Sequence, residues 1–287
     1  MKGGLGVPAS AEGRRVALIV SYDGAGFAGF QRQPGVQTVQ SALEAALADL
    51  AGAAVVVRGA GRTDAGVHAA GQVVDFALPA LLAIPTPRLP LALASRLPPG
   101  IAAAAAYDVP AGFHARKGAL GKRYRFLIWR PGVTSPFWRA WAWPYAGRLD
   151  VPAMQAAAGA FVGRQDFAAV AGAARPVADA TRTLVACTVY ADGPWVAIEV
   201  EADGFLYRMV RAIAGTLVAV GRGALPAAEV PRILRDGRRA AAGPSLPAHG
   251  LCLLWVRYGP PAGLPPPGHP DWPVPPGPPL WRPSTVS

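Results

Sequence analysis

The sequence has few cysteines and no pattern of metal ligands. Only Cys187 and Cys252 occur among the 287 residues, and neither belongs to a C-x-x-C pair. We expect both to lie in strands as small apolar side chains. The four histidines show no ligand spacing with the cysteines or with each other. The sequence therefore predicts neither a zinc site nor another metal site.

Long apolar runs and a phosphate-binding loop are also missing. No apolar run reaches the roughly 18 residues that a membrane span requires, and no apolar block follows Lys2. We therefore expect no membrane segment and no secretory signal, which makes the cytoplasm the default location. The pattern G-x-x-x-x-G-K-[ST] does not occur, so a P-loop nucleotide site is excluded.

Basic residues outnumber acidic ones, giving a net charge of +11 and a pI of about 10.5. Such an excess favours a polyanionic partner, because each neutralised phosphate releases counterions. Lysine is scarce, however, and the excess is almost all arginine in a background rich in alanine, glycine and proline. Codon bias in a GC-rich genome produces the same composition, so charge alone leaves nucleic-acid binding and composition as two open explanations.

Strand and helix patterns alternate in two successive halves. The expected strands are 15–22, 54–58, 72–77, 122–129, 183–190, 195–201 and 251–258, and the expected helices are 38–50, 89–96, 151–163, 206–220 and 227–236. Because the strands are often consecutive, we predict an α+β fold rather than a doubly wound parallel sheet. We expect four parts: a flexible segment 1–14, α/β subdomains at 15–112 and 113–258, and a proline-rich extended tail at 259–287.

One glycine pattern resembles a dinucleotide fingerprint. Residues 24–29 fit G-x-G-x-x-G and follow a strand. A pyrophosphate site requires a helix to begin directly after the glycines, but Pro34 and Gly35 intervene here. The next expected strand ends in Arg58 rather than in an acidic ribose ligand. We therefore reject a nicotinamide or flavin oxidoreductase.

The most informative segment is 61–69, GRTDAGVHA, which places Arg62 and Asp64 in a glycine-bounded loop between two expected strands. From residue chemistry alone, the loop is more typical of a turn in which Asp64 accepts backbone hydrogen bonds. His68 is then an ordinary packed or hydrogen-bonded histidine.

Over the same residues the chain resembles the TruA family of tRNA pseudouridine synthases. The resemblance covers residues 15 to 258, and its blocks follow the order of the family. The matching blocks are 22–24 with Gly29 and Gln31, 38–40, 43–44, 61–72 with Phe76, 113–116, 122–124, 204–206, 209–211 and 247–251. The chain departs from the usual family residues at Phe27, Phe30, Gln165 and Leu246, which puts only local loop contacts in doubt.

The resemblance implies an isomerase that converts uridine to pseudouridine at positions 38 to 40 of the tRNA anticodon arm, with no cofactor and no metal. It implies two RRM-like or ferredoxin-like halves that share an extended antiparallel sheet, with the active site in a basic cleft between them. It further implies a homodimer. A catalytically inactive RNA-binding module of the same fold is the competing interpretation.

The family match assigns the reaction to Asp64, an ionised carboxylate that attacks C1′, adds to uracil C6 or removes the 2′ proton. Arg211 is the candidate cation that holds Asp64 charged, and Tyr124 the candidate surface for the flipped uracil. The competing structural roles are a phosphate-facing helix residue for Arg211 and a half-buried strand aromatic for Tyr124.

Two further residues are expected at the nucleotide. Arg62 fills the vacated stack or binds a phosphate, and Leu251 forms an apolar wall of the uracil pocket, unless it is only core packing. The candidate contacts to the tRNA backbone are Arg14, Arg15, Arg58, Arg116 and Arg123.

Overall fold

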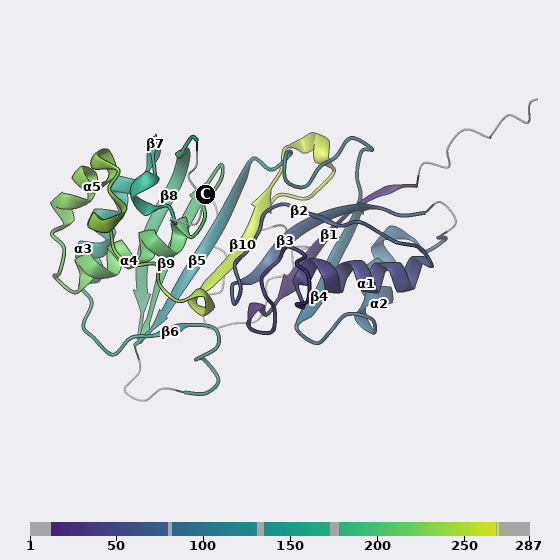
Figure 1. Ribbon diagram of the computed structural model, residues 1–287, viewed down its shortest axis with the longest axis horizontal. Helices are drawn as coiled ribbons and strands as arrows, with labels where there is room; N and C mark the ends of the chain where they lie inside the picture. The colour runs from purple at the N-terminus through teal and green to yellow at the C-terminus, as the bar shows by residue number, and fades with distance from the viewer. Residues whose placement is uncertain (1–12, 80–81, 131–134, 173–177, 268, 270–287) are drawn as a thin grey trace, which may run out of the picture.

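A ten-stranded sheet runs through the whole molecule in the computed structural model, which describes residues 13–79, 82–130, 135–172, 178–267 and 269 (Figure 1). The main strand order is β4-β1-β3-β10-β5-β9-β8-β7, while β2 pairs with β3 and β6 with β5. Helices α1 and α2 accompany one end of the sheet, and α3, α4 and α5 the other. The α+β prediction is confirmed.

The strands are β1 (Arg15–Tyr22), β2 (Arg58–Gly59), β3 (His68–Ala77), β4 (Ile101–Asp108), β5 (Gly121–Trp129), β6 (Trp143–Pro144), β7 (Gly163–Asp166), β8 (Thr181–Asp192), β9 (Trp195–Ala202) and β10 (Leu251–Arg257). The α-helices are α1 (Val39–Ala51), α2 (Leu89–Ala94), α3 (Val151–Ala158), α4 (Met209–Gly221) and α5 (Val230–Asp236). No helix in the described part of the chain is long and apolar enough to span a membrane.

Strand β10 joins the two ends of the sheet. It runs antiparallel to β5 along its length, and it pairs in parallel with the start of β3 through Cys252 opposite His68 and Leu253 opposite Ala69. The last strand in the sequence therefore lies at the centre of the sheet. The division into subdomains at residues 112 and 113 stays a prediction, and residues 1–12 of the expected N-terminal segment lie outside the described residues.

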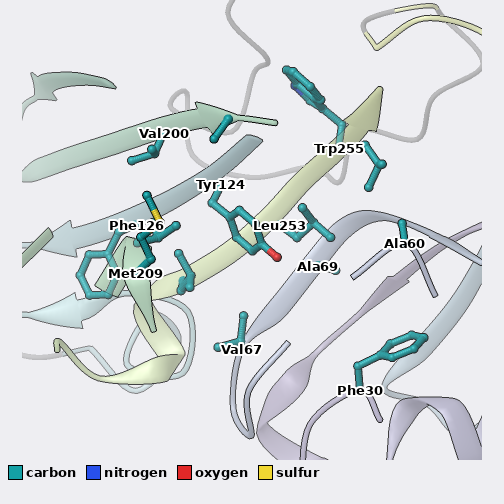
Figure 2. Close-up of a cluster of buried hydrophobic side chains, with 14 of the residues drawn as sticks. Phe30, Ala60, Val67, Ala69, Tyr124, Phe126, Val200, Met209, Leu253 and Trp255 are labelled. Atoms are coloured by element: carbon teal, nitrogen blue, oxygen red, sulfur yellow. The ribbon is translucent and has the colours of Figure 1, made fainter. Parts of the chain in front are cut away.

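The buried core continues across this junction (Figure 2). Side chains from β3, β10, β5 and α4 belong to one apolar cluster, which includes Ala69, Leu253, Tyr124 and Met209. Because protein interiors are closely packed, this cluster holds the surrounding loops in fixed relative positions. The loop before β3 and the start of α4 are thereby brought to the same place.

Several elements differ from the sequence prediction. Strand β4 was not expected, because alanine has little preference for strands, but its backbone pairs with β1 along the edge of the sheet. The expected strand 54–58 is reduced to Arg58–Gly59, since the backbone of Val57 is bound instead by side chains of α1. The four-residue β7 was missed as well.

The expected helix 206–220 begins later than its pattern indicated. Arg208 adopts a left-handed backbone with φ 57°, so regular helix starts at Met209. In the expected helix 151–163, the α-helix ends at Ala158, and a single 3-10 turn follows at Gly159–Phe161.

The first residues of the proline-rich segment pack against the core. Ala262 and Leu264 contact the main apolar cluster. A chain ending at Tyr258 is therefore expected to keep its turnover but to lose a few degrees in Tm, at about 2–4 °C per kcal/mol of lost packing. Thermal unfolding and turnover should be compared with those of a chain ending at residue 269. A large loss of turnover in the shorter chain would contradict this expectation.

Candidate active site

A cleft of about 930 Å³ opens between the two halves of the sheet. It is a size typical of small-molecule sites. Six of the residues expected at the site line it, although they come from segments far apart in the sequence. They are Arg62, Asp64, Arg116, Tyr124, Arg211 and Leu251.

The loop that carries Asp64 is held on both sides by hydrogen bonds. The Tyr22 hydroxyl lies 2.9 Å from Thr63 Oγ1, and the Phe30 N–H donates to the Thr63 carbonyl at 3.0 Å. The Gln72 amide donates to the Gly61 carbonyl at 3.0 Å. The carboxylate next to Thr63 is therefore attached to a rigid backbone.

The first and last glycines of the G-x-G-x-x-G pattern make room for this loop. A Cβ on Gly24 would lie 2.1 Å from the Val67 carbonyl oxygen, and one on Gly29 would lie 2.8 Å from that of Thr63. Gly29 also has φ 92°, a conformation that favours glycine. Since α1 begins only at Val39, these glycines serve loop packing and do not aim a helix at a pyrophosphate.

His68 is a packed, hydrogen-bonded histidine. Its Nδ1 lies 3.1 Å from both the Gly24 N–H nitrogen and Asp23 Oδ1, and its Nε2 lies 3.1 Å from the His249 carbonyl. The ring stacks on Trp141 with centroids 4.6 Å apart. Burial lowers the pKa of the imidazole against the opposing charge of Asp23, so His68 is neutral and ties the Asp64 loop to the segment before β10.

Asp64 and Arg211 form the expected ion pair. Arg211 Nη1 lies 2.9 Å from Asp64 Oδ2, and Arg211 Nε donates to the Leu246 carbonyl at 2.6 Å. The carboxylate side chain is 26% exposed and the arginine 12%, so the pair borders the cleft with the carboxylate more open to it. The guanidinium is thus anchored to the backbone at one end and to Asp64 at the other.

Tyr124 and Leu251 supply the apolar part of the cleft. Both are buried, and the Tyr124 ring packs edge-on against Phe205 with centroids 5.0 Å apart. Burial raises the pKa of the Tyr124 phenol, with smaller contributions from Tyr22 and Asp64, so the hydroxyl is neutral at pH 7. Leu251 belongs to the core and also lines the cleft, so its two expected roles coincide.

Three further cations line the cleft: Lys122, Arg182 and Arg208. Burial lowers the pKa of the Lys122 ammonium to about 8, and the charge of Arg116 adds to the effect. Lys122 could have been found from the sequence, because it lies two residues before Tyr124 and strand side chains alternate between faces. No sequence signal marked Arg182 or Arg208.

Three of the expected backbone-binding arginines are used elsewhere in the fold. Arg15 Nη1 lies 2.6 Å from Asp75 Oδ2, and Arg58 binds the same carboxylate. Arg14 donates to the Ile84 carbonyl. Asp75 is fully buried, so its two arginine partners neutralise a charge inside the protein.

Arg123 lies on the face of β5 opposite to Tyr124. Its guanidinium binds Glu199 at 3.3 Å and Glu201 at 2.8 Å, and only 13% of its side chain is exposed. Of the five arginines expected to contact the tRNA backbone, Arg116 is the one that lines the cleft.

No group of three or more potential ligands in the described residues could hold a metal ion.

Comparison with known proteins identifies the family. A family model described as tRNA pseudouridine synthase matches residues 18–116 and 157–259. The tRNA pseudouridine synthase A of Moorella thermoacetica is 44% identical over 243 residues, which cover 84% of this chain and 98% of the relative. That of Shouchella clausii is 45% identical over 248 residues, covering 86% of this chain and 94% of the relative.

A solved chain from the "Crystal Structure of a Cbf5-Nop10-Gar1 Complex" aligns with 71% of this chain and 45% of its own length. Its TM-score of 0.33 and identity of 15% are too low to add to the assignment. The family model covers parts of both halves of the sheet and the cleft-lining segments that carry Asp64, Arg211 and Leu251. The chain belongs to the tRNA pseudouridine synthase family.

Proposed function

We propose that the protein converts uridine to pseudouridine at positions 38 to 40 of the tRNA anticodon arm, with Asp64 as the catalytic carboxylate. The observation that carries the proposal is the Asp64–Arg211 pair, which borders a cleft beside the buried ring of Tyr124. Membership of the family supports the reaction, and the geometry supports the choice of residues.

The reaction breaks the N1–C1′ bond, turns the uracil and forms the C5–C1′ bond. One proton leaves C5 and one is bound at N1, so the product has the composition of the substrate and no oxidant or reductant is consumed. A uridine in a stem must first be swung out of the stack, at a cost of a few kcal/mol. Nucleotides near a loop are easier to unstack, which suits an anticodon-arm target.

Asp64 would act through Oδ1. Oδ2 is bound by Arg211, whereas Oδ1 has no hydrogen-bond partner in the described chain. Attack on C1′, addition to C6 and removal of the 2′ proton all require an ionised, well-aimed oxygen of this kind. Arg211 holds the carboxylate in place through the 2.9 Å contact between its Nη1 and Oδ2.

Tyr124 and Leu251 would hold the swung-out base. The neutral phenol ring offers a flat surface for the uracil, and the leucine closes the pocket with apolar surface. Around them, Arg116, Lys122, Arg182 and Arg208 have no acidic partner within the described residues, so we assign them to RNA phosphates. A homodimer and a cytoplasmic location are further proposals, made from the family resemblance.

Lys122 makes the phosphate assignment testable by pH. The ammonium is charged below about pH 8 and neutral above it, so kcat/KM for tRNA is expected to fall as pH rises through that value. Lys122→Met should lower kcat/KM several-fold at pH 7 and remove this alkaline decline. Lys117→Met, at an exposed lysine outside the cleft, should keep the wild-type profile. Identical alkaline declines in the wild type and Lys122→Met would contradict the assignment.

The function is tested by tritium release from tRNA labelled at uridine C5, followed by mapping of pseudouridine in the product. We expect release, and modification confined to positions 38 to 40. A catalytically inactive RNA-binding module would bind the tRNA and release no tritium. Titration with a nicotinamide nucleotide should produce no change in absorbance or fluorescence, whereas an oxidoreductase would respond.

A further inference from the structure

Arg62 is held at the rim of the cleft by a single side chain. Its Nε donates to Gln31 Oε1 at 3.0 Å. Within the described residues the terminal nitrogens of its guanidinium have no hydrogen-bond partner and no acidic neighbour. An exposed arginine side chain samples many rotamers, so Gln31 is the group that can restrict the direction of this one.

Gln31 is itself fixed by a buried chain of hydrogen bonds that leads into α1. Its Nε2 donates to Gln40 Oε1 at 2.6 Å, and the Arg32 N–H donates to the same oxygen at 2.9 Å. Gln40 Nε2 donates to Glu44 Oε1 and to the Val57 carbonyl, each at 3.0 Å. Gln40 and Glu44 are only 7% and 8% exposed.

At the far end of this series of hydrogen bonds, both carboxylate oxygens of Glu44 also have donors. Glu44 Oε1 accepts from the Val57 N–H at 3.1 Å, and Glu44 Oε2 accepts from Arg32 Nη1 at 3.0 Å. Because Gln40 Oε1 faces two donors and its Nε2 faces two acceptors, its amide has one favourable orientation. That orientation requires Gln31 to present its Nε2 to Gln40 and its Oε1 to Arg62. Turning the Gln31 amide would place two donors against each other.

We propose that Gln31, held by Gln40 and Glu44, is the positioning residue for Arg62. The chain anchors the guanidinium through Nε and leaves both terminal NH2 groups directed at the RNA, as a fork suited to a phosphate oxygen pair or to the space vacated by the swung-out base. The conformational freedom of Arg62 is restricted before RNA binds, which lowers the cost of binding. This inference rests on the proposed function.

The same series of hydrogen bonds gives a reason for part of the family resemblance. Gln31, Gln40 and Glu44 are among the matching residues, yet the last two lie outside the cleft. They are one helical turn apart on α1, so they share a face. The side chain of Gln40 reaches the cleft lining through its hydrogen bond with Gln31.

A double-mutant cycle between Gln31 and Arg62 tests the inference, read as kcat/KM for tritium release from tRNA. Gln31→Leu is expected to lower kcat/KM about tenfold through misplacement of Arg62. The Gln31→Leu, Arg62→Met double variant should equal Arg62→Met alone, because the glutamine has nothing left to position. Effects that multiply, or a Gln31→Leu variant with wild-type kcat/KM, would overturn the inference.

Two comparisons separate positioning from general stability. Gln31→Glu loses the donor to Gln40 Oε1 but keeps an oxygen that accepts from Arg62, so it should recover only part of the loss. This recovery should vanish when Arg62 is Met. Gln33 lies in the same loop but donates to the Ala28 carbonyl at 2.9 Å, so the effect of Gln33→Leu should multiply with that of Arg62→Met. Recovery by Gln31→Glu in the Arg62→Met background would point to a structural role instead.

The cycle also distinguishes the two proposals. If the wild-type protein released no tritium, the proposed function would fail, and the same cycle would then be measured as tRNA affinity by filter binding. Equal affinities of the double variant and Arg62→Met would support the positioning chain. Independent effects on affinity would overturn it.

Discussion

Asp64→Asn is expected to abolish isomerisation, lowering turnover by at least about 1,000-fold, while tRNA affinity stays within a few-fold of wild type. Asparagine has nearly the shape of aspartate, and its carbonyl oxygen can still accept from Arg211 Nη1, which lies 2.9 Å from the carboxylate. The amide is uncharged and can neither attack carbon nor take a proton at neutral pH. Affinity should persist because phosphate contacts supply most of it.

Three measurements check this result together. Tritium release at saturating tRNA gives turnover, filter binding at a stated salt concentration gives affinity, and thermal unfolding shows that the variant is folded. A variant that turned over near the wild-type rate would refute the role of Asp64. A parallel loss of affinity would instead indicate that the side chain mainly binds RNA.

Arg211→Met is expected to lower turnover about 100-fold, because the carboxylate loses both its cation and its fixed direction. The arginine spans from the Leu246 carbonyl, 2.6 Å from Nε, to Asp64, 2.9 Å from Nη1. Arg211→Lys should recover only part of the loss. An ammonium supplies the charge, but its three donors do not form the rigid fork that makes both contacts.

Arg222→Met is the matched control for this prediction, because Arg222 is the exposed C-cap at the other end of α4. It should turn over as fast as wild type. The comparison is made with single-turnover rates at saturating protein, so that weaker RNA binding does not enter. If Arg211→Met stayed within a few-fold of Arg222→Met, the ion pair would have no part in the chemistry.

Much of the fold could be predicted because runs of β-branched and aromatic residues mark β1, β5, β8, β9 and β10. The alanine-rich β4 carries no such signal. It forms because its backbone groups complete the hydrogen bonds of β1, a partner more than 70 residues earlier in the sequence. Val57 shows the opposite case: its residue type favours a strand, but its backbone binds the side chains of Glu44 and Gln40 instead of a neighbouring strand.

Prediction of the site depended on the family resemblance more than on residue chemistry. By its chemistry alone Asp64 was more typical of a turn, and only the ordered matching blocks singled it out. The phosphate candidates could not be ranked from the sequence, because Arg58, Arg116 and Arg123 look alike in it. What separates them is the partner that a distant segment supplies: Asp75 for Arg58, and a glutamate pair for Arg123.

The alternation of side chains between the two faces of a strand could have improved the choice of phosphate-binding residues. If Tyr124 faces the cleft, Lys122 shares its face and Arg123 does not. The chain from Gln31 to Glu44 could not have been predicted in the same way, because it depends on the distances between a loop and a helix face. Such distances are set by packing rather than by spacing along the sequence.

A crystal structure of the protein with a bound anticodon stem-loop would test the central claim most directly. We predict one uridine swung out of the RNA into the cleft, with Asp64 Oδ1 in contact with its C1′, C6 or 2′ position and the Tyr124 ring against the uracil. A swung-out uridine held away from Asp64, or an RNA bound with every anticodon-arm base still stacked, would contradict it.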